Sequence, residues 1–389
     1  MVAAGQCHTV LLRSEGTAAA CGRNDDGQCD VPGLGEGLAY TQVAAGAAHT
    51  VLLRSDGTAA ACGRNDDGQC DVPALGECLA YTQVAAGYAH TVLLTNDGTA
   101  AACGWNDHGQ CDAPAPVEGL TYTQVAAGAA HTVLLRSDGT AAACGCNGEG
   151  QCDVPVPGEG LTYTQVAAGA AHTVVLRSDG TAAACGCNDD GQCDVPALGE
   201  GLTYTQVAAG AAHTVLLRSD GTAAACGLNN RGLSDVPAPG EGLTYTHVAA
   251  GDWHTVVLRS DGTAAACGYN GDGQCDVPAL GEGLSFTQPR ALPALLLQAS
   301  FGGASAQFLT LGGQEFDRVQ AAPADRLSDL RARLMAGRVS HTLGFFAIDA
   351  VLPGGRLLSR ASIGETCAAA FARADDGVPR REGQEKSTE

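Results

Sequence analysis

Aromatic residues and long apolar runs are both scarce in this chain of 389 residues. Phe, Trp and Tyr make up 4% of the residues, whereas hydrophobic residues make up 45%, so Ala, Val, Leu and Cys must build the core. No stretch approaches the roughly 20 apolar residues of a membrane span. The first residues, Met-Val-Ala-Ala-Gly, show no basic region followed by an apolar run. We therefore expect no signal peptide and no membrane segment, and a cytoplasmic or nuclear protein.

Basic residues are rare in the first three quarters of the chain. Residues 1–288 hold 9 Lys and Arg against 31 Asp and Glu, a net charge of −22, whereas the remainder holds 12 against 11. A field of this sign repels phosphate backbones and attracts basic partners. We therefore expect no direct binding of nucleic acid, and a basic protein as one possible partner.

A repeat organises residues 1–288. The tripeptide start His-Thr-Val recurs at intervals of 41 residues without insertion or deletion, which is the signature of a repeat architecture. The seven histidines of this motif are His8, His49, His90, His131, His172, His213 and His254.

One unit, residues 201–241, illustrates the local pattern. Thr203–Val207, His213–Arg218 and Thr222–Cys226 are strand candidates, and Ser219-Asp220-Gly221 is typical of a hairpin turn. Residues 229–237 are rich in Gly, Asn, Asp and Pro, which predicts a loop. A unit of this length accommodates about four short strands, the content of one propeller blade. No window shows the apolar spacing of an amphipathic helix.

The ends of the repeat region complement each other. The first unit lacks the strand of Tyr-Thr-Gln type that precedes the histidine motif elsewhere, and Leu284–Gln288 supplies such a segment after the seventh unit. A last strand that completes the first blade would close the ring and remove a free edge. The sequence therefore predicts a mainly β fold in which residues 1–288 form a seven-bladed β-propeller.

The repeat resembles a known family. Its pattern VAAG-x-x-HT-V-L-L-x-S-D-G-T-x-x-x-x-G-x-N-x-x-G-Q-x-D-V-P is similar to the regulator of chromosome condensation repeat, over about three quarters of the chain. The resemblance implies a seven-bladed propeller used for guanine nucleotide exchange, ubiquitin-ligase scaffolding, ultraviolet sensing or membrane-traffic binding. WD repeats have a similar length, but the Trp-Asp dipeptide is absent here.

Two departures from the family narrow the function. The family has Trp before the Gly of the third strand, and this chain has cysteine instead, which argues against light sensing by tryptophan. These cysteines are Cys21, Cys62, Cys103, Cys144, Cys185, Cys226 and Cys267. All units also have equal length, so none carries the protruding insertion through which exchange factors of the family engage a GTPase.

The repeated histidines and cysteines raise the question of a metal. The histidines come one per unit with no second ligand at zinc spacing, so we expect structural residues that hydrogen-bond their own blade. The second cysteine of most units, eight residues after the first, permits disulfides, but small core thiols are favoured in an unsecreted chain. The loop Asn24–Asp30 lacks the ligand pattern of an EF-hand. We expect no metal and no cofactor.

Near-identical repeats offer no asymmetric catalytic cluster, so we expect no enzyme, and the informative positions are those where the units differ. One such position holds Arg23, Arg64, Trp105, Cys146, Cys187, Leu228 and Tyr269. The other lies just before the histidine and holds Gln6-Cys7, Tyr88-Ala89 and Asp252-Trp253, against Ala-Ala elsewhere. Neutral drift and a recognition rim are both open interpretations, and Arg, Trp and Tyr favour the second. The binding candidates are Arg23, Arg64, Trp105, Tyr269, Tyr88, Asp252 and Trp253.

The remainder of the chain differs in composition. We expect a linker over residues 289–294 and an α+β domain over residues 295–370. Strands are predicted over Gln307–Leu311, Glu315–Ala321 and Ala347–Leu352, with a helix opened by Pro323 and Asp325. This order resembles the ubiquitin-like fold. Residues 371–389 form a polar tail that we expect to be disordered, and its end without Gly-Gly argues against a conjugated modifier.

These observations predict a non-enzymatic protein-binding scaffold or adaptor, in ubiquitin-linked processes if the resemblance of the C-terminal domain holds. The alternative is a guanine nucleotide exchange factor for a small GTPase. The expected partner is accordingly a protein, either basic or a small GTPase. We expect the chain to be a monomer.

Overall fold

The computed structural model describes residues 1–76, 78–281 and 283–286, together with five short strands further along the chain. Contacts divide the chain into two units, Met1–Pro289 and Arg290–Glu389, which are described separately. The part of the chain that the structure describes contains no helix long and apolar enough to cross a membrane.

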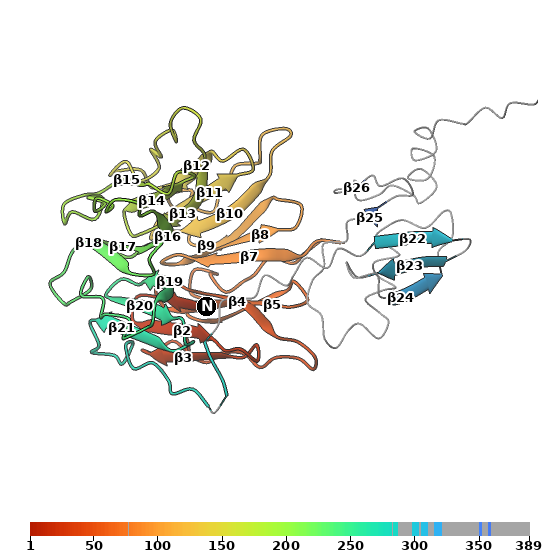
Figure 1. Ribbon diagram of the computed structural model, residues 1–389, viewed down its shortest axis with the longest axis horizontal. Coiled ribbons are helices and arrows are strands. Elements are labelled where there is room, and N and C mark those ends of the chain that lie inside the picture. Colours follow the sequence, from red (N-terminus) through yellow and green to blue (C-terminus); the bar gives the residue numbers. More distant parts are fainter. Residues whose placement is uncertain are drawn as a thin grey trace, which may run out of the picture. The chain divides into compact units, whose positions relative to one another are not determined.

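Seven antiparallel sheets of three strands each make up the first unit, and they follow one another in chain order (Figure 1). The first strands of the sheets are β1 (Val2–Ala4), β4 (Tyr40–Ala45), β7 (Tyr81–Ala86), β10 (Tyr122–Ala127), β13 (Tyr163–Ala168), β16 (Tyr204–Ala209) and β19 (Tyr245–Ala250). The middle strands are β2 (His8–Leu12), β5 (His49–Arg54), β8 (His90–Thr95), β11 (His131–Arg136), β14 (His172–Arg177), β17 (His213–Arg218) and β20 (His254–Arg259). The third strands are β3 (Ala18–Gly22), β6 (Ala59–Gly63), β9 (Ala100–Gly104), β12 (Ala141–Gly145), β15 (Ala182–Gly186), β18 (Ala223–Gly227) and β21 (Ala264–Gly268).

The predicted fourth strand of each blade is absent from the described residues, so the prediction of four strands was wrong. The segment in question runs as turns and irregular chain from the end of one blade to the start of the next. In the sixth unit it carries Pro237 and Pro239 together with Gly240 and Gly242. Proline has no N–H to donate to a ladder and glycine weakens strands, which explains the loop.

The core lies between successive blades, because the middle strand of each sheet is buried on both faces. In β5, Leu52 packs against Val10 and Leu12 of the first blade. On the opposite face of the same strand, Val51 and Leu53 pack against the third blade. The run His-Thr-Val-Leu-Leu is therefore buried at every position, as expected for a strand covered on both sides.

The first strands of all seven sheets form the inner ring of the propeller. Each of them contacts the first strand of the next sheet, and β1 contacts both β4 and β19. The seven sheets therefore close on themselves.

The predicted closing segment is confirmed in its described part. Phe286 pairs antiparallel with Arg13 of the first blade, and the Ser14 amide donates to the Ser285 carbonyl at 2.9 Å. The Phe286 side chain packs among Val2 and Leu11. Residues 287 and 288 of the predicted segment lie outside the described residues.

In the second unit, the structure describes strands only. β22 (Gln298–Gly302), β23 (Ser305–Leu309) and β24 (Glu315–Gln320) form one antiparallel sheet in that order, and β25 (Ala350–Val351) pairs with β26 (Leu357–Leu358). The three predicted strands overlap β23, β24 and β25, whereas β22 and β26 were missed. The predicted linker, helix and tail lie outside the described residues, and the ubiquitin-like fold stays a prediction.

Candidate functional site: the variable face of the propeller

The two variable positions of each unit lie side by side. In every blade the residue after the third strand donates its amide to the carbonyl of the residue before the histidine, as in Arg23 to Cys7 and Tyr269 to Trp253, both at 2.8 Å. Gly22 has a φ of +108°, a conformation that favours glycine, and it aims the chain into this contact. We call this end of the ring, formed by residues 5–7, residue 23 and their equivalents, the variable face.

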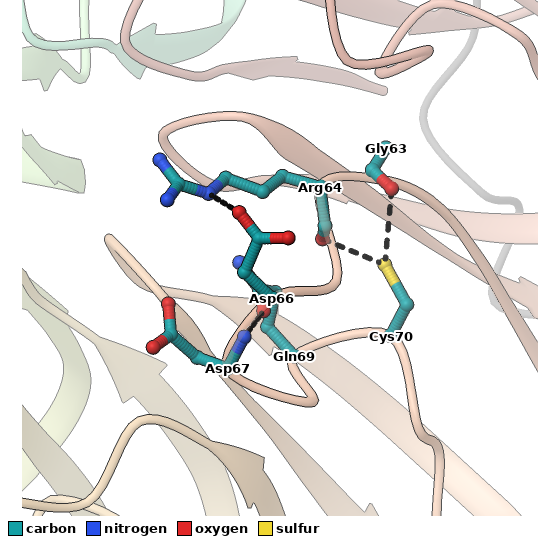
Figure 2. A network of polar contacts seen from close by, with 6 residues as sticks. All are labelled: Gly63, Arg64, Asp66, Asp67, Gln69 and Cys70. Carbon is teal, nitrogen blue, oxygen red and sulfur yellow. Dashed lines mark hydrogen bonds and ion pairs between the residues drawn. The ribbon is translucent and has the colours of Figure 1, made fainter.

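The exposed arginines of the variable face are held by acidic residues of their own loops. Arg64 Nε lies 2.8 Å from Asp66 Oδ2, and Figure 2 shows the pair above the loop that Gln69 and Cys70 hold in place. Arg23 makes the same bond to Asp25. Such exposed pairs contribute little stability, but they fix the direction of the guanidinium groups.

The aromatic residues at the same position are held in other ways. The ring of Trp105 meets the ring of His108 edge to face, with centroids 5.0 Å apart. The hydroxyl of Tyr269 occupies the space that a Cβ at Gly271 would need. The equivalent residues of the first two units are Asp25 and Asp66, which hold the arginines, whereas Gly271 leaves room for the Tyr269 hydroxyl.

A cation–π cluster joins the sixth and seventh units. The Arg231 guanidinium lies 4.4 Å from the ring centroid of Tyr269 and 5.3 Å from that of Trp253. Arg231 was not among the binding residues predicted from the sequence. A signal was present, because the equivalent residues are acidic or histidine: Asp26, Asp67, His108, Glu149, Asp190 and Asp272.

The remaining candidates, Tyr88 and Asp252, lie at the axis of the ring. Together with Gln6 they line a cavity of about 250 Å³ whose other lining residues are Ala and Gly. The Tyr88 side chain is exposed, and burial raises the pKa of Asp252 to about 6, an effect that a hydrogen bond from Gln6 partly offsets. The structure thus places all seven candidates on the variable face, at two distances from the axis. That they bind a partner stays a prediction.

The repeated histidines link neighbouring blades. His8 Nε2 lies 2.9 Å from Thr50 Oγ1 of the second blade, and that hydroxyl donates its single proton to the Gln28 carbonyl at 2.8 Å. The histidine must therefore donate through Nε2. The expectation of a hydrogen bond within the same blade was wrong, because blades pack so closely that the nearest acceptor belongs to the next one.

The histidines and the loop Asn24–Asp30 make their hydrogen bonds within the protein. Burial, followed by repulsion from His49, lowers the pKa of His8 to about 3. In the loop, the Asn24 side chain donates to Asp30 and accepts from the Cys29 amide. Among the described residues, no group of three or more His, Cys, Asp or Glu is placed to hold a metal ion.

The cysteines of the third strands are only partly buried, which corrects the expectation that they are thiols of the core. The third strand is the outermost of each blade, so one side of it is open. Cys62 Sγ donates to the Gln28 carbonyl of the preceding blade at 3.8 Å. Burial is the main cause that raises the pKa of Cys62 to about 12, with a contribution from Cys70. The reactive thiolate is therefore rare at neutral pH.

We expect these seven cysteines to react slowly in the folded protein. A rise in the pKa from its ordinary value to about 11 or 12 lowers the thiolate fraction, and labelling by a bulky thiol reagent should be about 100-fold slower than after unfolding. Site-resolved mass spectrometry measures this, with the exposed Cys78 as the rapidly labelled reference. Rapid native labelling would contradict the prediction, and absent labelling after denaturation would indicate disulfides.

The closed ring of seven sheets defines the class of protein, a seven-bladed β-propeller with one differentiated face. The chain belongs to the regulator of chromosome condensation (RCC1) repeat family, whose model matches seven segments. These are residues 2–28, 40–69, 81–110, 122–151, 163–192, 204–233 and 245–274.

Solved structures share the propeller fold. Human WBSCR16 matches with a TM-score of 0.57 and 21% identity over 66% of this chain and 85% of its own. Prp20p of Saccharomyces cerevisiae matches with a TM-score of 0.53 and 20% identity over 62% of this chain and 74% of its own. The ectodomain of the Physcomitrella patens receptor kinase CR4 matches with a TM-score of 0.56 and 18% identity over 69% of this chain and 73% of its own. A comparison with curated protein sequences gives no match.

Proposed function

We propose that this chain is a non-enzymatic protein-binding propeller, a scaffold or adaptor whose recognition surface is the variable face. One observation carries the proposal: the large residues at the two variable positions lie on this face, and neighbouring side chains hold them there. Arg231, Trp253 and Tyr269 come from two units and are in contact. Independent drift would not be expected to place three departures against each other.

The large residues at the variable positions are also distributed unevenly around the ring, which favours a binding surface on one side of the variable face. The fourth and fifth blades carry Ala-Ala before the histidine and the small residues Cys146 and Cys187 after the third strand. The large side chains belong to the other blades. Arg, Trp and Tyr are the residues that most often anchor interfaces, and here they are held in place before any partner arrives.

The charge of the repeats narrows the class of partner. Residues 1–288 carry a net charge of −22, which attracts basic proteins. Prp20p, which shares the fold, is described by its binding properties to Gsp1p and histones. We propose a basic protein or a small GTPase as the partner. A role in ubiquitin-linked processes depends on the ubiquitin-like resemblance of residues 295–370.

Affinity capture with the full chain tests the proposed surface. The double variant Trp105→Ala, Arg64→Ala should weaken binding of a captured partner by about 2 kcal/mol, because it removes two anchors of the interface. The melting temperature should not change, since Arg64 is exposed and Trp105 lies outside the sheet, directly after β9. The control is Val156→Ala, which shortens a side chain that is 84% exposed in the loop between β12 and β13.

The outcomes are distinct. Equal affinity of the double variant and the control would assign the variation to drift and contradict the proposal. The same protein should be added to a small GTPase loaded with labelled GDP. Nucleotide release well above the background rate would replace the scaffold function by guanine nucleotide exchange.

A further inference from the structure

The axial cavity of the propeller has an unusual composition. Its volume is about 250 Å³, and all but three of its lining residues are Ala or Gly. The three others, Gln6, Tyr88 and Asp252, supply an amide, a phenol and a carboxyl group. The other four blades have Ala at the equivalent place. The ring is therefore nearly symmetric except for the groups that give the cavity its chemistry.

Asp252 carries the charge of this cavity. Its hydrogen-bond partner is the side-chain amide of Gln6, which belongs to the neighbouring first blade. The ion pairs of the described residues are Arg23 with Asp25 and Arg64 with Asp66, and neither involves Asp252. A partly buried carboxylate without a cation retains unsatisfied acceptor capacity, because an ionised carboxylate accepts about four hydrogen bonds.

The backbone around the axis adds further acceptors. The carbonyl of Gly46 accepts a hydrogen bond from the backbone N–H of Gln6 at 3.2 Å. The carbonyl of Gly128 accepts one from the backbone N–H of Tyr88, also at 3.2 Å. Both glycines line the cavity. Each carbonyl has two lone pairs, so one donor leaves room for a second. The aromatic ring of Tyr88 provides a surface that attracts cations.

We propose that this cavity receives the primary ammonium group of a lysine side chain from a basic partner, with Asp252 as its counter-ion. The inference rests on the proposed protein-binding function and specifies one contact of it. A compact ammonium with three donors suits a single carboxylate surrounded by carbonyls, whereas a planar guanidinium is suited to bidentate pairing. Residues 1–289 contain no lysine, so the lysine must come from outside the propeller.

A synthetic peptide of ten lysines with blocked ends is the probe, and its affinity for the full chain is measured by calorimetry. The variant Asp252→Asn keeps the shape of the side chain and should weaken binding by about tenfold or more, as for a buried charge contact. The matched control is Glu200→Gln, which removes the same charge from an exposed loop and should change affinity less than about twofold. With a peptide of ten arginines, Asp252→Asn should have no larger effect than the control.

A second variant tests the cavity without changing the charge. Ala129→Gln places in the fourth blade the side chain that Gln6 provides in the first, and it should obstruct the cavity and weaken lysine binding. Three results would overturn the proposal: no binding to the unmodified chain, equal weakening by Asp252→Asn and Glu200→Gln, or unchanged binding in both cavity variants. Displacement of the peptide by CaCl₂, beyond that by NaCl of equal ionic strength, would assign the cavity to a metal ion instead.

The inference and the proposed function can fail separately. If Asp252→Asn leaves lysine binding unchanged while the Trp105 and Arg64 double variant loses its partner, only the axial contact is wrong. If Asp252→Asn abolishes peptide binding while the double variant captures its partner normally, the axial contact stands and the outer part of the variable face is not the interface.

Discussion

Acidification from pH 7 to pH 5 should unfold the propeller, because the seven repeated histidines are buried and must stay neutral in the folded state. Burial lowers the pKa of His172 to about 3 and that of His131 to about 4. In the unfolded chain these groups titrate near 6.5. Between pH 6.5 and pH 4 these histidines bind protons in the unfolded state but not in the folded state. Their contribution to the free energy of unfolding is therefore fully present above pH 6.5 and is lost as the pH falls toward 4. Each histidine should lower the free energy of unfolding by about 2 kcal/mol between pH 7 and pH 5.

The sum over seven histidines is comparable with the whole stability of a folded domain, about 5–15 kcal/mol, so the transition should be steep. Asp252 acts in the opposite direction, since its raised pKa lets the folded state bind a proton first, but it is one group against seven. Melting temperatures from pH 8 to pH 4.5 measure the effect. His131→Gln should reduce the dependence on pH, whereas His108→Gln, at an exposed position, should not. Unchanged melting between pH 7 and pH 5 would contradict the argument.

The ring could be predicted from the sequence because its information is local and repeated. The spacing of 41 residues, the turn Ser219-Asp220-Gly221 and the strand-like runs define each blade without knowledge of its neighbours. Ring closure was predictable too, since the missing strand at one end reappears at the other. The length of the unit would accommodate a fourth strand, but Pro237 and Pro239 have no N–H to donate to a β-ladder.

Contacts between blades could not be predicted, because no local pattern records which residues of adjacent blades meet. The hydrogen bond between His8 and Thr50 joins positions 42 residues apart. The repeated sequence is equally compatible with a hydrogen bond within one blade. The same limit hid the Arg231 cluster, whose members lie in two units. Variation between units identified the residues of the variable face, but their division into an axial and an outer group is seen only in the folded structure.

Ring closure by residues 284–286 should account for a large part of the stability of the propeller. The Phe286 amide donates to the Gly262 carbonyl at 2.8 Å, and its side chain is buried beside Val256 and Leu258 of the last blade. Phe286 also pairs with Arg13 of the first blade. The segment therefore joins the two ends of the ring, and its loss exposes an unpaired edge and the apolar surface beneath it.

Deletion of residues 284–288 from the full chain should lower the melting temperature by more than about 10 °C, since both the ring contact and a buried aromatic side chain are lost. Phe286→Ala alone removes the side chain and keeps the backbone bonds, and it should cost about 3–5 kcal/mol. The larger loss in the deletion separates the contribution of the backbone pairing from that of packing. Val156→Ala, at an exposed position, serves as the control for a shortened apolar side chain. An unchanged melting temperature in the deletion variant would show that the first and last blades hold together through β1 and β19 without this segment.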